Sequence, residues 1–200
     1  MNFPKRTFEN PILESSFRTS DYGISKVFVK YYSNENHGIQ IVFDWLTCHL
    51  QFVQWVYDGN TAEAFHKKCD NKGATIVIAK VTNSEHIVGG YNPLQWDSSN
   101  KYKLTSSSFI FSFINRTNLQ TAKVGHINDG FFKYSVYCYP NYGPTFGNGH
   151  DLFQYKDTIW RSYNVFSYPK IDIPENPNSD YYSYNDFNVE DYEVFQVIEK

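Results

Sequence analysis

The stretch ATIVIAKVTNSEHIVGGY, residues 74–91, decides the fold class of this chain. Its first part, ATIVIAKV, is apolar on both alternating faces, which is typical of a strand buried in the middle of a sheet. The polar TNSEH then turns the chain into a second strand, IVGGY. Two glycines inside that strand, Gly89 and Gly90, predict a bulge or a close approach to the backbone. The fold is therefore expected to grow from a central antiparallel hairpin.

Further strands are expected on both sides of this hairpin. The segment SSSFIFSF places Phe109, Phe111 and Phe113 on one face, and VEDYEVFQVI near the end alternates in the same way. Residues 24–32, ISKVFVKYY, are expected to form an edge strand. In residues 39–59 we expect a helix in the first half and a strand in the second half.

One helix is expected immediately before the hairpin. Asn60 is a candidate N-cap, because its side chain can accept hydrogen bonds from free backbone N–H groups, and Glu63 follows at the spacing of a capping box. Ala62, Phe65 and Cys69 share one face at spacings of three and four residues. We therefore expect a short amphipathic helix that packs on the sheet.

Composition limits the class of protein. The chain has 200 residues, of which 41% are hydrophobic and 19% aromatic, and its net charge is −3. No basic block marks a nucleic-acid surface, and no apolar run approaches the roughly 18 residues of a membrane span. Three cysteines favour reduced thiols in an intracellular protein over a disulfide framework. We expect a mainly β (α+β) fold, with residues 1–38 as an N-terminal segment and residues 39–200 as a single domain.

Five segments, in order, resemble the TLDc domain of oxidation-resistance proteins: YDGNTAEAFHKKCDNKGATIVIAKV, IVGGYNPLQW, SSSFIFSF, YGPTFGNGHDLF and DYEVFQV. They extend from Phe52 to Ile198, and GGYNPLQW and FHKKCDNKG are most similar to expanded fungal members of the family. The resemblance implies a two-sheet antiparallel β-sandwich with a few short peripheral helices. The residues that carry these motifs, with structural roles expected, are Asp58, Gly59, Phe65, Asp70, Asn71, Gly73, Gly89, Gly90, Trp96, Phe109, Phe111, Gly143, Phe146, Gly147, Gly149, Asp151, Glu193 and Phe195.

The resemblance also carries expectations about function. It implies protection against oxidative stress, in some members through binding to the vacuolar proton-pumping ATPase (V-ATPase). The family brings no accepted catalytic motif, so we expect a non-enzymatic protein-interaction domain without a cofactor. The expected location is intracellular and cytoplasmic, at the periphery of organelle membranes.

The most site-like stretch is FGNGHDLF, residues 146–153. A phosphate loop leads into a helix, whereas the residues that follow here alternate like a strand. This alternation places His150 with Leu152 and puts Asp151 with Phe153 on the opposite face, which separates the His-Asp pair. We expect Asp151 to accept backbone N–H bonds from the turn and His150 to be the residue free to contact a partner.

A second candidate is the pair His66 and Cys69, three residues apart on the helix. Such a pair suggests a thiol nucleophile or a redox sensor. However, both residues lie towards the helix C-terminus, where the dipole disfavours a thiolate. We expect Cys69 to be structural, with a sensor or sacrificial role as the alternative. No metal site is expected, since ligand pairs such as CxxC or HExxH are absent.

Glu193 is a third candidate, because it shares an apolar strand face with Phe195 and Val197. A carboxylate there needs hydrogen-bond partners, for which we consider Arg161, or else marks a functional site at a sheet edge.

Aromatic residues outside the expected strands offer a further kind of site. Tyr181, Tyr182 and Tyr184 occur in a polar loop, and Trp96 and Trp160 lie near other loops. Exposed, such residues favour contacts with proteins or sugars. The alternative is that they fold back over the sandwich.

Two other functions compete with the interaction domain. One is a thiol- or carboxylate-dependent enzyme, hydrolase or peroxidase-like, that uses Cys69 and His66 or Asp151 and Glu193. It requires a nucleophile, a base and an orienting group to converge in one pocket. The other is a sugar-binding sandwich that uses surface tyrosines and tryptophans.

Overall fold

A computed structural model describes the backbone of residues 28–33, 39–44, 50–55, 60–115, 121–163, 167–174 and 184–199. Side chains are described within these ranges from residue 60 to residue 197. The chain divides into two compact units, residues 1–46 and 47–200. The motif residues Asp58 and Gly59 and the loop tyrosines Tyr181 and Tyr182 lie outside the described residues.

The first unit contains an antiparallel hairpin of β1 (Phe28–Ser33) and β2 (Ile39–Asp44). The strand expected at residues 24–32 is therefore present as β1. The helix expected in the first half of residues 39–59 is wrong, because β2 is a strand. Its β-branched residues, Ile39, Ile41 and Val42, favour the extended backbone. The boundary after residue 38 stays a prediction.

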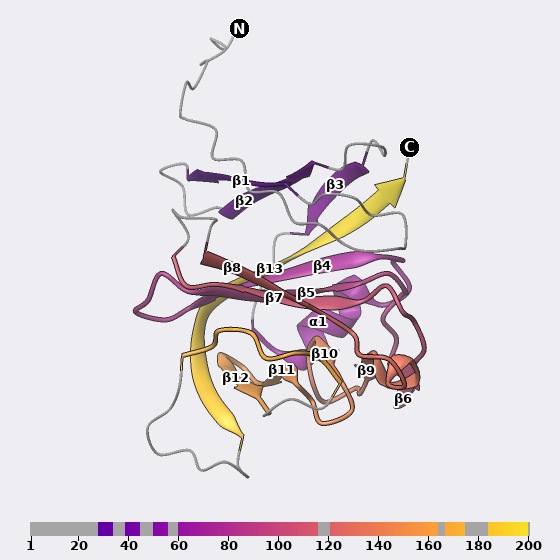
Figure 1. The fold of residues 1–200 in the computed structure, drawn as a ribbon. Coiled ribbons are helices and arrows are strands. Elements are labelled where there is room, and N and C mark those ends of the chain that lie inside the picture. The colour runs from indigo at the N-terminus through magenta and orange to yellow at the C-terminus, as the bar shows by residue number, and fades with distance from the viewer. Residues whose placement is uncertain are drawn as a thin grey trace, which may run out of the picture. The chain divides into compact units, whose positions relative to one another are not determined.

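The second unit is mainly β, and its described residues contain one α-helix and one short 3-10 helix (Figure 1). Its elements are β3 (Leu50–Trp55), α1 (Ala62–Cys69), β4 (Thr75–Val81), β5 (Ile87–Asn92), β6 (Lys101–Lys103), β7 (Phe109–Phe113), β8 (Ala122–His126), η2 (Phe132–Tyr134), β9 (Val136–Cys138), β10 (Thr145–Phe146), β11 (Leu152–Lys156), β12 (Ile159–Ser162) and β13 (Asn185–Glu199).

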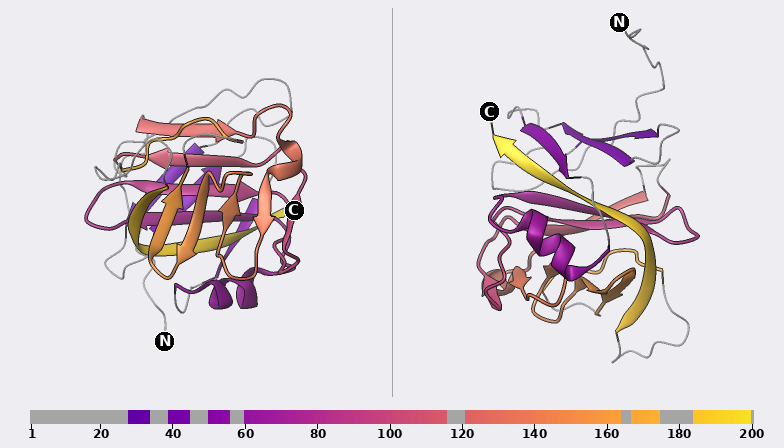
Figure 2. Two further views of the ribbon diagram at one scale, coloured as in Figure 1. Left: turned by 90° about the horizontal axis from the view of Figure 1, so that it is seen from below. Right: turned by 180° about the vertical axis from the view of Figure 1, so that it is seen from behind.

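These strands form one antiparallel sheet in the order β6-β9-β10-β11-β12-β13-β4-β5-β7-β8, with β3 also paired to β13. The 15-residue β13 pairs with β12 through residues 185–188 and with β4 from Val189 onwards. A register shift between Val189 and Asp191 marks a bulge there, and bulges bend strands. Strand β13 curves from one layer into the other, so the two halves of the sheet face each other (Figures 1 and 2).

The mainly β, antiparallel fold is thus confirmed, but a sandwich of two separate sheets is not. The sequence predicted the last strand only over Val189–Ile198, where alternation is clear. The four residues before it, 185–188, pair with β12 and make the sheet continuous. A change of partner within one strand leaves no periodic signal, because alternation reports the faces of a strand and not its neighbours.

The main core lies between the two halves of the sheet. It contains Val77 and Val88 from one half, Phe146 and Trp160 from the other, and Phe65 from α1. Strand β4 lies between β13 and β5, and all its residues except Lys80 are buried, which confirms the prediction that it is central.

The glycine pair of β5 permits close approach and makes no bulge. Strands β4 and β5 stay in continuous register across both glycines. A Cβ atom on Gly89 would lie 2.1 Å from the carbonyl oxygen of Val77, and one on Gly90 would lie 2.6 Å from the ring of Phe146. These two positions therefore set how closely β5 packs against its surroundings.

Helix α1 forms where the sequence predicted it, with a cap shifted by one residue. The N-cap is Thr61, whose hydroxyl accepts a hydrogen bond from the Ala64 N–H at 3.2 Å, so the expected Asn60 cap is wrong. Phe65 and Cys69 are buried and Lys67 is exposed, as the apolar face predicted.

Candidate functional site

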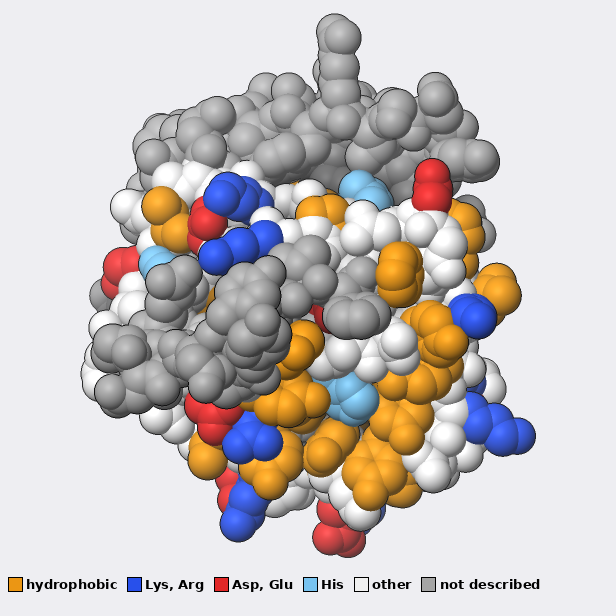
Figure 3. Space-filling view, turned by 60° about the horizontal axis from the view of Figure 1, so that its bottom comes forward, with side chains coloured by type: hydrophobic (Ala, Val, Ile, Leu, Met, Phe, Trp, Pro, Cys, Tyr) orange, Lys and Arg blue, Asp and Glu red, His pale blue; other side chains and the backbone are white. Residues whose placement is uncertain are grey.

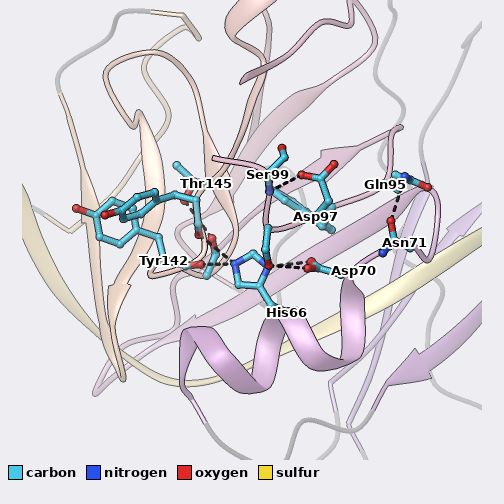
Figure 4. A network of polar contacts seen from close by, with 12 residues as sticks. His66, Asp70, Asn71, Gln95, Asp97, Ser99, Tyr142 and Thr145 are labelled. Carbon is cyan, nitrogen blue, oxygen red and sulfur yellow. Dashed lines mark hydrogen bonds and ion pairs between the residues drawn. The ribbon is translucent and has the colours of Figure 1, made fainter. Parts of the chain in front are cut away.

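His66, on α1, lies at the centre of a network of polar contacts (Figure 4). Its Nδ1 is 2.8 Å from Asp70 Oδ1, and its Nε2 is 3.0 Å from the Tyr139 carbonyl oxygen and 2.9 Å from that of Tyr142. Carbonyl oxygens only accept hydrogen bonds, so Nε2 carries a proton that these two oxygens share. The side chain is buried, and it connects α1 to the turn between β9 and β10.

Asp70 extends this network to a third segment of the chain. Its Oδ2 accepts a hydrogen bond from the Ser98 hydroxyl at 2.9 Å, and Asp70 also forms an isolated parallel bridge with Trp96. Next to it, the Gln95 amide donates to Asn71 Oδ1 at 3.2 Å. The helix end, the loop after β5 and the turn after β9 are thereby held together.

This geometry is poorly suited to catalysis by His66 and Cys69. Both ring nitrogens of His66 already face acceptors, so neither is placed to take a proton from a nucleophile. Burial, followed by the nearby Asp70 carboxylate, raises the pKa of the Cys69 thiol to about 12. A thiol with such a pKa stays protonated and unreactive at neutral pH. Cys69 belongs to the core, as the structural interpretation expects.

Asp151 holds the loop FGNGHDLF against a distant segment. Its Oδ2 accepts hydrogen bonds from the backbone N–H of Ser167 at 2.7 Å and of Tyr168 at 2.8 Å. These donors lie 16 and 17 residues further along the chain, and not in the turn itself as the sequence suggested. The turn is closed instead by the His150 N–H, which donates to the Gly147 carbonyl.

His150 is not part of the strand in which the sequence placed it, and its contact with a partner stays a prediction. Strand β11 begins at Leu152, and His150 lies in the preceding turn with φ of 58°, in the left-handed region. Strand alternation therefore does not govern its direction. Its ring centroid lies 5.1 Å from that of Phe153 and 5.3 Å from that of Tyr137. Burial of the ring lowers the pKa of His150, so the neutral form is favoured.

The ring of His150 belongs to a continuous band of aromatic side chains. We call this band the aromatic strip, and it consists of Tyr137, Tyr139, Tyr142, His150, Tyr155 and Tyr184, packed on the buried Phe153. Hydrophobic side chains gather into a broad patch on one face of the molecule (Figure 3).

Period-two alternation explains the part of the strip that lies on β9 and β11. On β11, Leu152 and Gln154 face the core, and Phe153 and Tyr155 face outwards. On β9, Val136 and Cys138 are core residues, so the intervening Tyr137 faces outwards. Tyr137 and Tyr155 therefore lie on the outer face of this half of the sheet, and the other members of the strip join them from the adjoining turns.

Arg161, which packs on the strip, is part of an ion pair. The guanidinium carbon of Arg161 lies 3.5 Å from the centroid of the Tyr155 ring, and Arg161 makes a bidentate ion pair with Asp186 at 2.8 and 3.0 Å. Although partial burial opposes it, this pair raises the pKa of Arg161. The pairing of Arg161 with Glu193 considered from the sequence is therefore wrong, because Arg161 stands opposite Asp186 in the register of β12 and β13.

The remaining sequence candidates are distributed over the molecule. Glu193 is buried on β13, between the core residues Tyr192 and Val194 and hence on the opposite face. Trp96 and Trp160 are fully buried, so they are not surface contacts as one interpretation of the sequence suggested. Tyr184 is 41% exposed and belongs to the strip. Of the residues proposed for an enzyme, His66 and Asp151 are bonded to backbone groups of distant segments, Cys69 is a core residue, and Glu193 lies on the outer face of β13.

Sequence reasoning missed most of the strip, although a signal was present. The segments VYCY and LFQYK both place aromatic residues at every second position, while the positions between them are filled by core residues. On a strand with one face in the core, such aromatic residues must lie on the outside.

The described residues offer neither a membrane-spanning helix nor a metal cluster. No helix among them has the length and apolar character needed to cross a membrane. In the same part of the chain, no group of three or more histidine, cysteine, aspartate and glutamate side chains is arranged to hold a metal ion.

The chain was also compared with known proteins. A family model described as the TLDc domain matches residues 44–198, which is most of the chain. A search of curated proteins finds no match.

Proposed function

The chain belongs to the TLDc domain family, and from that membership we propose that it is a protein-interaction domain without enzymatic activity, linked to the response to oxidative stress. Its partner would be the vacuolar proton-pumping ATPase, as the resemblance to oxidation-resistance proteins implies. The domain would then act inside the cell, in the cytoplasm, at the periphery of organelle membranes.

The observation that supports an interaction domain most strongly is the aromatic strip. Tyrosine is enriched in protein interfaces, because it offers a large apolar ring at a small entropic cost and a hydroxyl group for hydrogen bonds. In the strip, these rings and that of His150 pack edge to face, tilted or stacked at centroid separations of 4.7 to 5.8 Å. Their mutual packing limits their motion before a partner arrives, which reduces the entropic cost of binding.

The polar network of His66 supports the same proposal, because its bonding is structural rather than catalytic. It resembles a catalytic constellation in composition, yet each of its polar atoms is bonded to a structural partner. The network fixes the turn that carries Tyr139 and Tyr142, which are two residues of the strip. We infer that its role is to hold the binding surface in shape.

The experiment is affinity purification of the tagged full chain from cells, with and without peroxide, followed by mass spectrometry. We expect pump subunits among the partners, and we expect a strain without the protein to lose peroxide tolerance. A tag-only strain is the control for recovery. Unchanged tolerance together with an absence of pump subunits would overturn the proposal.

A further inference from the structure

We propose that His66 and Asp70 share a proton that acts as a pH-sensitive switch, and that its release at rising pH detaches the turn between β9 and β10 from α1. This inference goes beyond the proposed function and does not depend on it, since it concerns hydrogen bonds within the fold alone.

Both ring nitrogens of His66 face acceptors. Nε2 faces the carbonyl oxygens of Tyr139 and Tyr142 at 3.0 and 2.9 Å, and Nδ1 faces a carboxylate oxygen of Asp70 at 2.8 Å. A carbonyl group and an ionised carboxylate accept hydrogen bonds and donate none. A proton must therefore lie on each side of the ring, one on Nε2 and one between Nδ1 and Asp70. The pair thus holds one proton more than a neutral imidazole beside a carboxylate.

Two segments other than α1 bring ionisable groups to this network. The turn after β9 carries the phenol groups of Tyr139 and Tyr142, and burial raises the pKa of Tyr142. The loop after β5 carries Asp97, which has a pKa of about 2 and contacts Lys103. Tyr142 therefore stays neutral and Asp97 stays ionised over the range from about pH 5 to 8 in which an imidazole ordinarily changes its charge.

The remaining ionisable groups near the ring belong to the end of α1. Lys68 and Lys72 act electrostatically on Cys69, the residue before Asp70. Burial, followed by the Asp70 carboxylate, raises the pKa of Cys69 to about 12, so this thiol stays neutral over the same range. The His66–Asp70 pair is therefore the group of this network whose charge state we expect to change there.

Neither neutral form of His66 satisfies both sides of its ring. A neutral imidazole carries one N–H. With that proton on Nε2, the lone pair of Nδ1 faces the carboxylate of Asp70; with the proton on Nδ1, the lone pair of Nε2 faces two carbonyl oxygens. Loss of the extra proton therefore removes the hydrogen bonds on one side of the ring.

The turn is the side that loses its hydrogen bonds. A hydrogen bond to an ionised carboxylate is roughly twice as strong as one to a neutral acceptor. His66 and Asp70 are also four residues apart at one helix end, so their contact does not need the turn. The proton thus stays on Nδ1, and the carbonyl groups of Tyr139 and Tyr142 lose their donor. The stability that the extra proton contributes is present at low pH and lost as the pH rises.

The test is a nuclear magnetic resonance titration of the full chain, labelled with nitrogen-15, from about pH 5 to pH 9. We expect protons on both ring nitrogens of His66 at the lower end and on Nδ1 alone at the upper end. The amide signals of residues 139–143 should shift with the same midpoint as the ring. A ring that keeps both protons throughout, a neutral ring with its proton on Nε2, or turn signals that do not follow the ring would each overturn the proposal.

Asp70→Asn separates the switch from a purely structural role. The amide group of asparagine can donate to Nδ1, so a neutral His66 with its proton on Nε2 satisfies both sides of the ring. We expect this variant to keep the turn attached and to lose the pH-dependent shifts of residues 139–143. Asp97→Asn is the matched control, because it removes a nearby carboxylate that makes its ion pair with Lys103, and it should keep the shifts.

Shifts that persist in folded Asp70→Asn, or that disappear in Asp97→Asn, would contradict the assignment. The titration of the wild type decides the matter by itself if Asp70→Asn does not fold. No partner is present in either measurement, so a failure of the switch leaves the proposed function standing, and a failure to recover pump subunits leaves the switch standing.

Discussion

Replacing His66 with alanine tests whether the polar network is structural. The substitution removes the ring that contacts Asp70 at 2.8 Å and the carbonyl oxygens of Tyr139 and Tyr142 at 3.0 and 2.9 Å. Asp70 keeps its bond from Ser98, whereas the two carbonyl oxygens lose the proton that they share. A buried polar group left without a partner costs ~1–3 kcal/mol, and the lost packing of the ring adds to this. We expect a loss of about 3 kcal/mol in the free energy of unfolding.

The loss is measurable by urea denaturation and by thermal melting. For a urea m-value of ~2 kcal/mol/M, the midpoint would fall by about 1.5 M. In a protein of this size, 1 kcal/mol shifts the melting temperature by ~2–4 °C, so we expect a decrease of about 6–12 °C. Lys67→Ala is the control on the same helix, because Lys67 is exposed, and it should change stability by less than ~0.5 kcal/mol. A loss below about 1 kcal/mol in His66→Ala would refute the structural role of the network.

Three further predictions concern Gly89, Cys69 and Asp97. Gly89→Ala should lower the free energy of unfolding by more than ~3 kcal/mol, because its Cβ would lie 2.1 Å from the backbone oxygen of Val77. Gly73→Ala is the control: its φ is 79° and the space around it is open, so it should cost only ~1–2 kcal/mol of backbone strain. Equal losses in denaturation would contradict this prediction. Cys69, with a pKa raised to about 12, should resist alkylation by iodoacetamide at pH 8 until the protein unfolds. Peptide mapping locates the alkylated cysteine, and rapid alkylation of Cys69 in the folded protein would refute its assignment to the core. Burial opposes ionisation of Asp97, but hydrogen bonds from Lys103 and Ser99 outweigh it and lower the pKa of Asp97 from 3.8 to about 2. The stability that Asp97 contributes is thus present above pH 3.8 and lost as the pH falls towards 2. The free energies of unfolding of the wild type and Asp97→Asn should therefore converge in that range. A difference that stays constant with pH would disprove the assignment.

Local patterns were sufficient to predict the centre of the fold. Strands β4 and β5 follow each other directly, and their apolar runs, turn and glycines all lie within residues 74–91. Helix α1 was found for the same reason, because its cap and apolar face are local features. Its N-cap was displaced by one residue since Asn60 and Thr61 are both suitable capping residues.

Features that depend on distant contacts were not predictable. His66 and the Tyr139 carbonyl are 73 residues apart, so nothing near either one indicates their hydrogen bond. Asp151 showed the same limit, because its donors come from Ser167 and Tyr168. The change of partner along β13 is likewise decided by the packing of whole strands.

The prediction that His150 continues the alternation of β11 was wrong for a different reason. The alternation of Leu152 to Tyr155 was extended backwards into a turn, where φ of 58° breaks the periodicity. Asn148 and Gly149 immediately before it are typical turn residues, and they were the signal that the strand had not yet begun. The part of the strip on β9 and β11 was predictable in principle, since it follows from alternation alone.

The central claim is that this TLDc domain binds a protein through the aromatic strip. The most direct measurement is quantitative affinity purification with mass spectrometry on three forms of the full chain: the wild type, the double variant Tyr155→Ala/Tyr184→Ala and the control Ile114→Ala. Ile114 is a similarly exposed hydrophobic residue (42%) that directly follows β7 in the other half of the sheet. We predict that pump subunits are recovered with the wild type and with Ile114→Ala, and lost with the folded double variant. Recovery that is equal in all three forms, or absent in the wild type, would contradict the claim.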